Sequence, residues 1–245
     1  MATSKQIAFI TGANRGIGLQ TARELGRAGF TVVLGVRDPQ QGEQALVELR
    51  GAGIDADLVA YDAKRPETDA GALAHLEKRY GRLDVLVNNA GVLREPLLEQ
   101  SAATVSPEDL RETFEVNLFA VVRLTQTLLP LLRKSAAGRI VNLSSILGSL
   151  TLHATEGSPI APAKAFAYNA SKAALNAFTI HLADQLRGTN IKVNSAHPGW
   201  VKTELGGAHA QMEIADSART SVRLASLGAD GPSGGFFHEA DTLPW

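Results

Sequence analysis

Short apolar runs alternate with longer stretches of helical pattern along the whole chain. Most of the runs are apolar at consecutive positions rather than at every second one, which is typical of strands covered by helices on both faces. Strands that alternate with helices imply right-handed crossovers and a parallel, doubly wound α/β sheet. The runs predict strands at IAFIT (7–11), TVVLGV (31–36), ADLVAY (56–61), LDVLVNN (83–89), GRIVNLS (138–144), IKVNSA (191–196) and GGFF (234–237).

The predicted helices have recognisable beginnings. Asp38-Pro39 and Ser106-Pro107 each place a capping side chain before a proline at the first helical position. Neither an internal repeat nor a linker interrupts the pattern, so we expect a single domain over residues 1–245. The segments near 92–105, 146–165 and 200–215 lie after predicted strands, and long loops in compact domains are usually functional. We expect these three segments to form the substrate site.

Composition narrows the function classes. The chain is 44% hydrophobic and 20% charged with a net charge of −1, which indicates a globular protein without the basic stripe of a nucleic-acid binder. The absence of cysteine excludes disulfides and thiolate chemistry and fits a reducing compartment. With no signal peptide and no apolar run of about 18 residues, we expect a cytoplasmic protein that does not span a membrane. The six histidines lack ligand spacing, so no metal site is expected, although His197 falls near the predicted ligand edge.

A glycine-rich turn, TGANRGIG (11–18), follows the first predicted strand and leads into a helix. Glycines at 12, 16 and 18 allow a tight turn and let backbone N–H groups approach a pyrophosphate at the helix N-terminus. The spacing is G-x-x-x-G-x-G, so the turn alone leaves open whether it binds a dinucleotide or is only a sharp connection. Its place after the first strand of a βαβ unit favours a dinucleotide.

Polar and turn residues follow the other predicted strands. Ligands bind outside the carboxyl ends of parallel strands, where the strand order reverses. An ordinary role in a loop or a helix cap could explain each residue singly, but it does not explain why all of them follow strands at the same edge of the sheet. The residues are Arg37, Asp62, Asn88-Asn89-Ala90-Gly91, Ser144-Ser145 and Pro198-Gly199.

The segment YNASK (168–172) places a phenol and an ammonium in an otherwise apolar helix. Tyr168 and Lys172 lie four residues apart, on one helical face, so each alters the proton affinity of the other. A nearby cation lowers the pKa of a phenol, and we therefore expect Lys172 to lower that of Tyr168. A tyrosine at the edge of the core with a lysine on the helix rim is the structural alternative.

Together, these motifs resemble the short-chain dehydrogenase/reductase family over nearly the whole chain. The resemblance rests on TGANRGIG, NNAG (88–91), Asn117 in FEVNLF, the serines at 144–145, YNASK and PGWVKTEL. Within the family the chain is most similar to NADP-dependent carbonyl reductases, through NRGIG, GVRD, HPGWVKTELGG and GGFFHEADTLPW. The resemblance implies a Rossmann fold with a seven-stranded parallel sheet in the order 3-2-1-4-5-6-7 and helices on both faces.

The resemblance also implies the site. Tyr168 becomes the acid/base, Ser145 holds the carbonyl oxygen, Lys172 binds the nicotinamide ribose, and Asn117 positions a water. Ser144 competes with Ser145, but the second serine of the pair is the active one in the family pattern. Arg15 and Arg37 suit a ribose 2′-phosphate, so NADP(H) is the expected cofactor. The expected cofactor-binding residues are Gly12, Asn14, Arg15, Gly16, Ile17, Gly18, Arg37, Asp62, Asn89, Ala90, Gly91, Tyr168, Lys172, Pro198, Gly199, Val201 and Thr203.

The expected function is NADPH-dependent, reversible reduction of ketones or aldehydes. A 3-ketoacyl or hydroxysteroid dehydrogenase and an NADP(H)-sensing regulator without turnover are the alternatives. The interval from Ser145 to Tyr168 is longer than in most family members, which favours a monomer or homodimer over a tetramer. The substrate stays open, because the candidate wall residues could equally be ordinary packing: Leu93, Ile146, Leu147, Trp200, Leu205 and Trp245.

Overall fold

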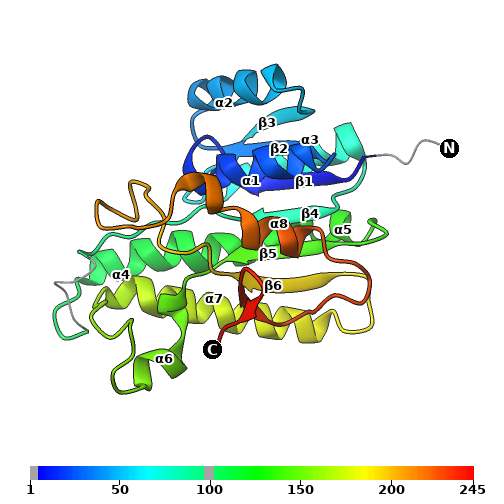
Figure 1. Cartoon of the computed structure of the whole chain (residues 1–245). Coiled ribbons are helices and arrows are strands. Elements are labelled where there is room, and N and C mark those ends of the chain that lie inside the picture. The colour runs from blue at the N-terminus through cyan, green and yellow to red at the C-terminus, as the bar shows by residue number, and fades with distance from the viewer. Residues whose placement is uncertain (1–4, 97–101) are drawn as a thin grey trace.

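One twisted sheet forms the centre of the protein (Figure 1). The computed structural model describes residues 5–96 and 102–245, so part of the predicted 92–105 loop lies outside the described residues. The strand order is β3-β2-β1-β4-β5-β6-β7-β8; the first seven strands are parallel, and β8 pairs antiparallel with β7. The strands are β1 (Ile7–Thr11), β2 (Thr31–Val36), β3 (Ala56–Ala60), β4 (Val85–Asn88), β5 (Arg139–Leu143), β6 (Lys192–Ala196), β7 (Phe236–His238) and β8 (Asp241–Thr242).

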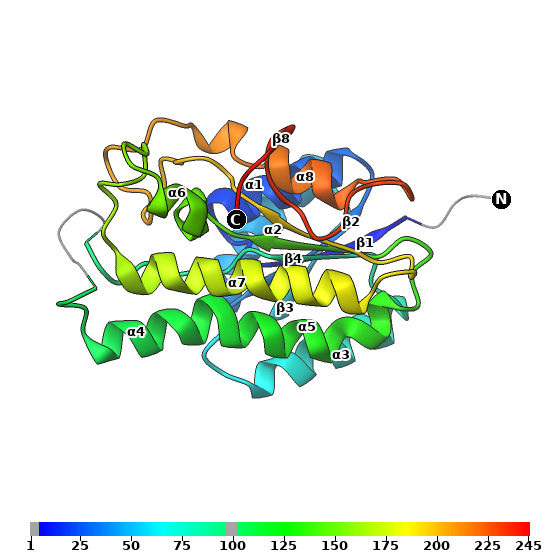
Figure 2. The same cartoon turned by 90° about the horizontal axis from the view of Figure 1, so that it is seen from below.

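Helices cover both faces of the sheet, as Figure 2 shows from below. On one face lie α3 (Glu67–Tyr80), α7 (Phe166–Gln185) and a long helical run composed of α4 (Pro107–Phe114), the π-turn η1 (Glu115–Phe119) and α5 (Ala120–Leu132). On the other face lie α1 (Gly16–Arg27), α2 (Pro39–Gly51) and α8 (Arg219–Ala225). Shorter helical turns occur in the connections: η2 (Ile146–Gly148), α6 (Leu150–Ala154) and η3 (Ile214–Asp216).

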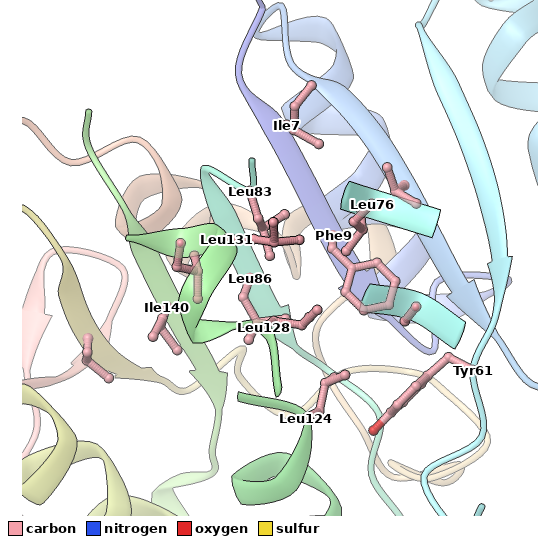
Figure 3. Packing of buried hydrophobic residues seen from close by; sticks show 14 of the residues in the cluster. Ile7, Phe9, Tyr61, Leu76, Leu83, Leu86, Leu124, Leu128, Leu131 and Ile140 are labelled. Atoms are coloured by element: carbon pink, nitrogen blue, oxygen red, sulfur yellow. The ribbon is translucent and has the colours of Figure 1, made fainter. Parts of the chain in front are cut away.

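Two hydrophobic clusters separate the sheet from its helical layers. Successive β1 residues point to opposite faces, so Phe9 belongs to one cluster and Ile10 to the other. The rings of Phe9 and Tyr61 pack edge to face, with their centroids 6.2 Å apart. Figure 3 shows the first cluster, in which α5 places leucines against the sheet: Leu124, Leu128 and Leu131, opposite Leu86 and Ile140. The prediction of strands covered on both faces is confirmed.

The observed elements differ from the predicted ones mainly at their ends. The predicted caps are correct: Asp38 accepts from the backbone of Gln40, and Ser106 accepts from that of Asp109. The strand β4 is shorter than the predicted 83–89 run, and β7 lies two residues further along than GGFF begins. The strand β8 was not predicted, because its two residues are exposed and carry no apolar pattern.

Among the described residues, one helical run, Pro107–Leu132, has the length and apolar composition that could cross a membrane. Half of its most apolar window is buried inside the protein. This run packs on the sheet through the α5 leucines of the first cluster. Its apolar character is therefore used in the core.

Candidate active site

A cleft of about 970 Å³ lies at the carboxyl ends of the parallel strands. The loops after β1, β2, β3, β4, β5 and β6 all contribute to its lining, so the predicted ligand edge is present. Each of the residues expected to bind the cofactor lines this cleft, as do Ser145, Tyr168 and Lys172. Asn117 is fully buried and lies behind the lining rather than on it.

The glycine turn is packed closely against the end of β4. Gly12 has a φ of +65°, which only glycine adopts without strain. A Cβ on Gly18 would lie 2.5 Å from the Asn89 side-chain amide and 2.5 Å from the Gly12 carbonyl oxygen. Asn89 Nδ2 donates to the Thr11 carbonyl at 2.7 Å, and Thr11 Oγ1 accepts from the Asn89 backbone at 3.0 Å. The Asn89 side chain therefore joins two strand ends, and this bond occupies its amide.

The first turn of α1 offers free amides to the cleft. Its N-cap residue, Arg15, makes no side-chain capping bond, and the turn contains no acidic residue. Gly16, Ile17 and Gly18 all line the cleft. Backbone N–H groups in this position, at the positive end of the helix dipole, form a binding site for an anion.

Two arginines flank this turn. Arg15 forms an exposed ion pair with Glu204 at 2.5 Å, and Arg37 lines the cleft from the end of β2. No acidic partner of Arg37 is found among residues 5–96 and 102–245. The neighbouring carboxylate, Asp38, is turned to the cap of α2, where it accepts from the Gln40 amide at 2.9 Å. The Arg37 guanidinium is therefore available to a ligand in the part of the cleft beside β2.

Tyr168 and Lys172 lie in the first turns of α7, both buried. Lys172 Nζ is 5.6 Å from the centroid of the Tyr168 ring and donates to the Leu143 carbonyl at 2.7 Å. The bond to Leu143 ties the ammonium to the end of β5. Two side chains expected to act together are thus held beside the two serines that follow the same strand.

Burial dominates the proton affinities of this pair. It raises the pKa of Tyr168 to about 12, although a hydrogen bond with Ser145 lowers it. It also lowers the pKa of Lys172 to about 8. The expectation that Lys172 brings the pKa of Tyr168 below its usual value is therefore wrong for the protein by itself. Desolvation of the phenolate is the largest cause of the raised pKa.

The two serines after β5 have different partners. Ser144 Oγ donates to Asn176 Oδ1 at 2.7 Å within the core. Ser145 Oγ accepts from the Leu147 amide at 3.2 Å and is the serine that bonds Tyr168. Ser144 is therefore engaged on α7, which favours Ser145 for contact with a substrate.

Asn117 lies within the π-turn η1, a local irregularity that is frequent at functional sites. Its Nδ2 donates to the Val92 carbonyl at 2.9 Å and to Ser171 Oγ at 3.0 Å, and its Oδ1 accepts from the Val92 amide at 2.8 Å. One bond of the amide nitrogen thus braces the segment after β4, and the other bonds it to α7. Asn117 thus links η1 to α7 through Ser171. Its role in positioning a water stays a prediction.

The segments near 146–165 and 200–215 contribute most of the apolar lining. Of the six candidate wall residues, Leu93, Ile146, Leu147, Trp200 and Leu205 line the cleft. Trp245 does not; its ring stacks on Phe236 at 5.6 Å. The predicted 146–165 segment also lines the cleft through residues that the sequence did not single out, because their loop has no regular pattern: Pro159, Ile160, Pro162 and Ala163.

His197 lines the cleft beside Pro198, as its position in the sequence suggested. Burial lowers its pKa to about 3, and His238, whose ring centroid is 4.9 Å away, contributes to this lowering. The imidazole is therefore neutral at physiological pH. Among the described residues, no group of three or more His, Asp or Glu side chains is placed to hold a metal ion.

Comparisons with known proteins show the family to which the chain belongs. The family model for short chain dehydrogenase matches residues 6–214, from β1 to η3. The chain belongs to the short-chain dehydrogenase family. Short-chain dehydrogenase/reductase 1 of Saponaria officinalis is 31% identical, with 98% of this chain and 96% of that protein covered. Carbonyl reductase 1 (NADPH) of Mus musculus is 30% identical, with both chains fully covered.

A solved structure extends the likeness of this short-chain dehydrogenase beyond sequence. The NADPH-bound carbonyl reductase from chicken fatty liver superposes with a TM-score of 0.85 at 27% identity, covering 99% of this chain and 100% of that one. The family model ends at 214, whereas this superposition includes α8 and β7. The predicted family, the parallel order of the seven strands and the two helical layers are all confirmed.

Proposed function

We propose that this short-chain dehydrogenase reduces ketones or aldehydes to alcohols with NADPH. The observation that carries the proposal is the group of Ser145, Tyr168 and Lys172 in the same cleft as the two arginines at the opposite end. The mouse and chicken relatives, which are named as NADPH-dependent or NADPH-bound carbonyl reductases, support it. A stopped assay with NADPH and a panel of carbonyl compounds tests it, and NADPH binding without oxidation by any of them would favour a sensing regulator.

The cleft residues fit NADP(H). The uncapped first turn of α1 would hold the pyrophosphate, and Arg15 and Arg37 would hold the 2′-phosphate. Lys172 would hold the nicotinamide ribose. The remaining lining residues expected at the cofactor, from Asp62 to Thr203, surround the same path along the strand ends.

The chemistry of the protein's own groups follows from their environment. When bound, NADPH supplies the hydride. With a pKa of about 12, Tyr168 is a neutral phenol at physiological pH and can donate its proton to the carbonyl oxygen. Ser145 would donate a hydrogen bond to the same oxygen, and Asn117 bonds Ser171 of the helix that carries the phenol. Apolar side chains around these groups exclude water from the reacting carbonyl.

The role of Lys172 can be tested through the pH profile of alcohol oxidation. In that direction Tyr168 acts as a base, so the rate rises with pH as the phenolate forms. Lys172, whose pKa is lowered to about 8, is charged below that pH, so Lys172→Met removes there the cation that favours the small phenolate fraction of Tyr168. We expect the rising limb of kcat to move to higher pH by about 1 unit or more, together with weaker cofactor binding. A weaker affinity with an unchanged pH profile would reduce Lys172 to a ribose ligand.

We expect a monomer or homodimer. The segment 146–165 places α6 beyond α7 (Figure 1), and the Thr151 amide of α6 donates to the Trp245 carbonyl at 2.8 Å. This segment therefore lies beside the C-terminal residue, and we expect it to obstruct the helical face that many family members use to form tetramers. Light scattering at micromolar concentration checks the prediction, and a stable tetramer would contradict it. A cytoplasmic location without a membrane or nucleic-acid partner remains part of the proposal.

A further inference from the structure

A buried carboxylate near the cleft has no part in the proposed reaction. Glu95, in the segment after β4, is only 3% exposed. Its Oε2 accepts a hydrogen bond from the backbone N–H of Tyr168 at 3.0 Å, and its Oε1 has no partner within the described part of the chain. Burying a carboxylate is unfavourable unless hydrogen bonds or a nearby charge compensate it, so the groups that hydrogen-bond to Glu95 must stabilise it.

The first turn of α7, which Glu95 contacts, has no side-chain cap from its own N-cap residue. Ala165 at the N-cap makes no side-chain bond, and the first turn contains no acidic residue. Burial raises the pKa of Glu95, whereas the backbone N–H groups of Tyr168, Ala167 and Phe166 lower it. These are the amides that a helix leaves unpaired at its start. A carboxylate from another part of the chain thus does the work of the missing cap.

The carbonyl side of Tyr168 is held as well. Ser171 Oγ donates to the Tyr168 carbonyl at 2.7 Å and accepts from Asn117 Nδ2 at 3.0 Å. Asn117 in turn pairs with both backbone groups of Val92. The segment 92–95 is therefore fixed at both ends, by Asn117 and by α7, and the backbone of Tyr168 is held on both of its polar groups.

We propose that Glu95 is a positioning residue for catalysis: it fixes the first turn of α7 so that the Tyr168 hydroxyl stays aligned with Ser145. The inference rests on the proposed role of Tyr168 as the proton donor. The two residues before Glu95, Leu93 and Arg94, line the cleft. The same short segment thus connects the wall of the substrate region to the helix that carries the acid.

Glu95→Gln tests the proposal because it keeps the size of the side chain, removes its charge and leaves one acceptor oxygen for the three amides at the start of α7. We expect kcat to fall about tenfold or more while the KM for NADPH changes by less than about twofold. The matched control is Glu108→Gln, an exposed acid in the first turn of α4, which should leave kcat unchanged. A folded Glu95→Gln enzyme with the kcat of the wild type would overturn the inference.

A double-mutant cycle with Tyr168→Phe separates positioning from a general structural role. If Glu95 acts through the hydroxyl, Glu95→Gln should lower the residual kcat of Tyr168→Phe by less than about twofold. A full, additive loss would overturn the inference. High activity of Tyr168→Phe alone would instead overturn the proposed function, so the two failures are distinguishable.

Glu95→Asp covers the case in which the glutamine variant does not fold. It keeps the charge but withdraws the carboxylate by about 1.5 Å, the length of one carbon–carbon bond. We expect the same lowered kcat with a nearly unchanged KM for NADPH. A wild-type kcat in this variant would contradict the inference.

Discussion

Tyr168→Phe is expected to lower kcat for carbonyl reduction by about 10²–10⁴-fold. The ring is buried in the wall of the cleft, so phenylalanine preserves the packing and removes only the hydroxyl. The hydroxyl is the group that bonds Ser145, and burial keeps it protonated at neutral pH. The measurement is steady-state turnover with NADPH, accompanied by NADPH binding and thermal unfolding, both of which should stay close to wild type.

The sequence provides a matched control among its three tyrosines. Tyr80 ends α3, and its hydroxyl donates to Asp57 at 2.9 Å, away from the residues that line the cleft. Tyr80→Phe removes the same atom and should leave kcat unchanged, even if it lowers the unfolding temperature. A Tyr168→Phe enzyme that keeps a third or more of the wild-type turnover would overturn the assignment.

The sheet could be predicted because its physical cause is local. Strands covered on both faces are apolar at successive positions, and the run TVVLGV shows this pattern in the sequence. The cap at Asp38 could be predicted as well, because the proline that follows it is favoured at the first position of a helix. The strand β8 has no such record, because its two exposed residues pair only after the chain turns at Glu239, whose φ is +48°.

The candidate site was predictable to the extent that it consists of strand ends. Gly12, Arg37 and Ser145 follow strands that could be identified, and parallel strands bring their carboxyl ends to one edge. Glu95 could not be found in this way. It is one of two acids in the 92–105 segment, and its burial against α7 depends on contacts made only in the folded protein.

The pKa of Tyr168 was mispredicted for a related reason. The spacing to Lys172 follows from helix geometry, so the neighbouring cation was visible in the sequence. The desolvation that raises the pKa depends on the burial of the phenol in the folded protein, which the spacing does not reveal. Sequence spacing therefore predicted which groups interact, and the three-dimensional environment determined the net direction.

The second large effect concerns the choice of cofactor. We expect the wild type to prefer NADPH over NADH by about tenfold or more in kcat/KM, which corresponds to about 1.4 kcal/mol. An acidic side chain at the end of β2 would favour the 2′-hydroxyl of NADH. Here Arg37 lines that corner, while the carboxylate of Asp38 is held in the cap of α2. A guanidinium can grip a 2′-phosphate through charge-assisted hydrogen bonds and gains little from a plain hydroxyl.

Arg37→Asp should therefore reverse the preference, because a carboxylate repels the 2′-phosphate and accepts a hydrogen bond from a ribose hydroxyl. Measuring kcat/KM for both cofactors at two salt concentrations checks the electrostatic origin, since screening should weaken the discrimination of an exposed charge. Arg187→Asp is the control for net charge: Arg187 is exposed just beyond the C-terminal end of α7, the end opposite Tyr168. It should leave the preference unchanged. Equal use of NADPH and NADH by the wild type would refute the assignment of Arg37 and, with it, the choice of NADP(H) from the charge at this corner of the cleft.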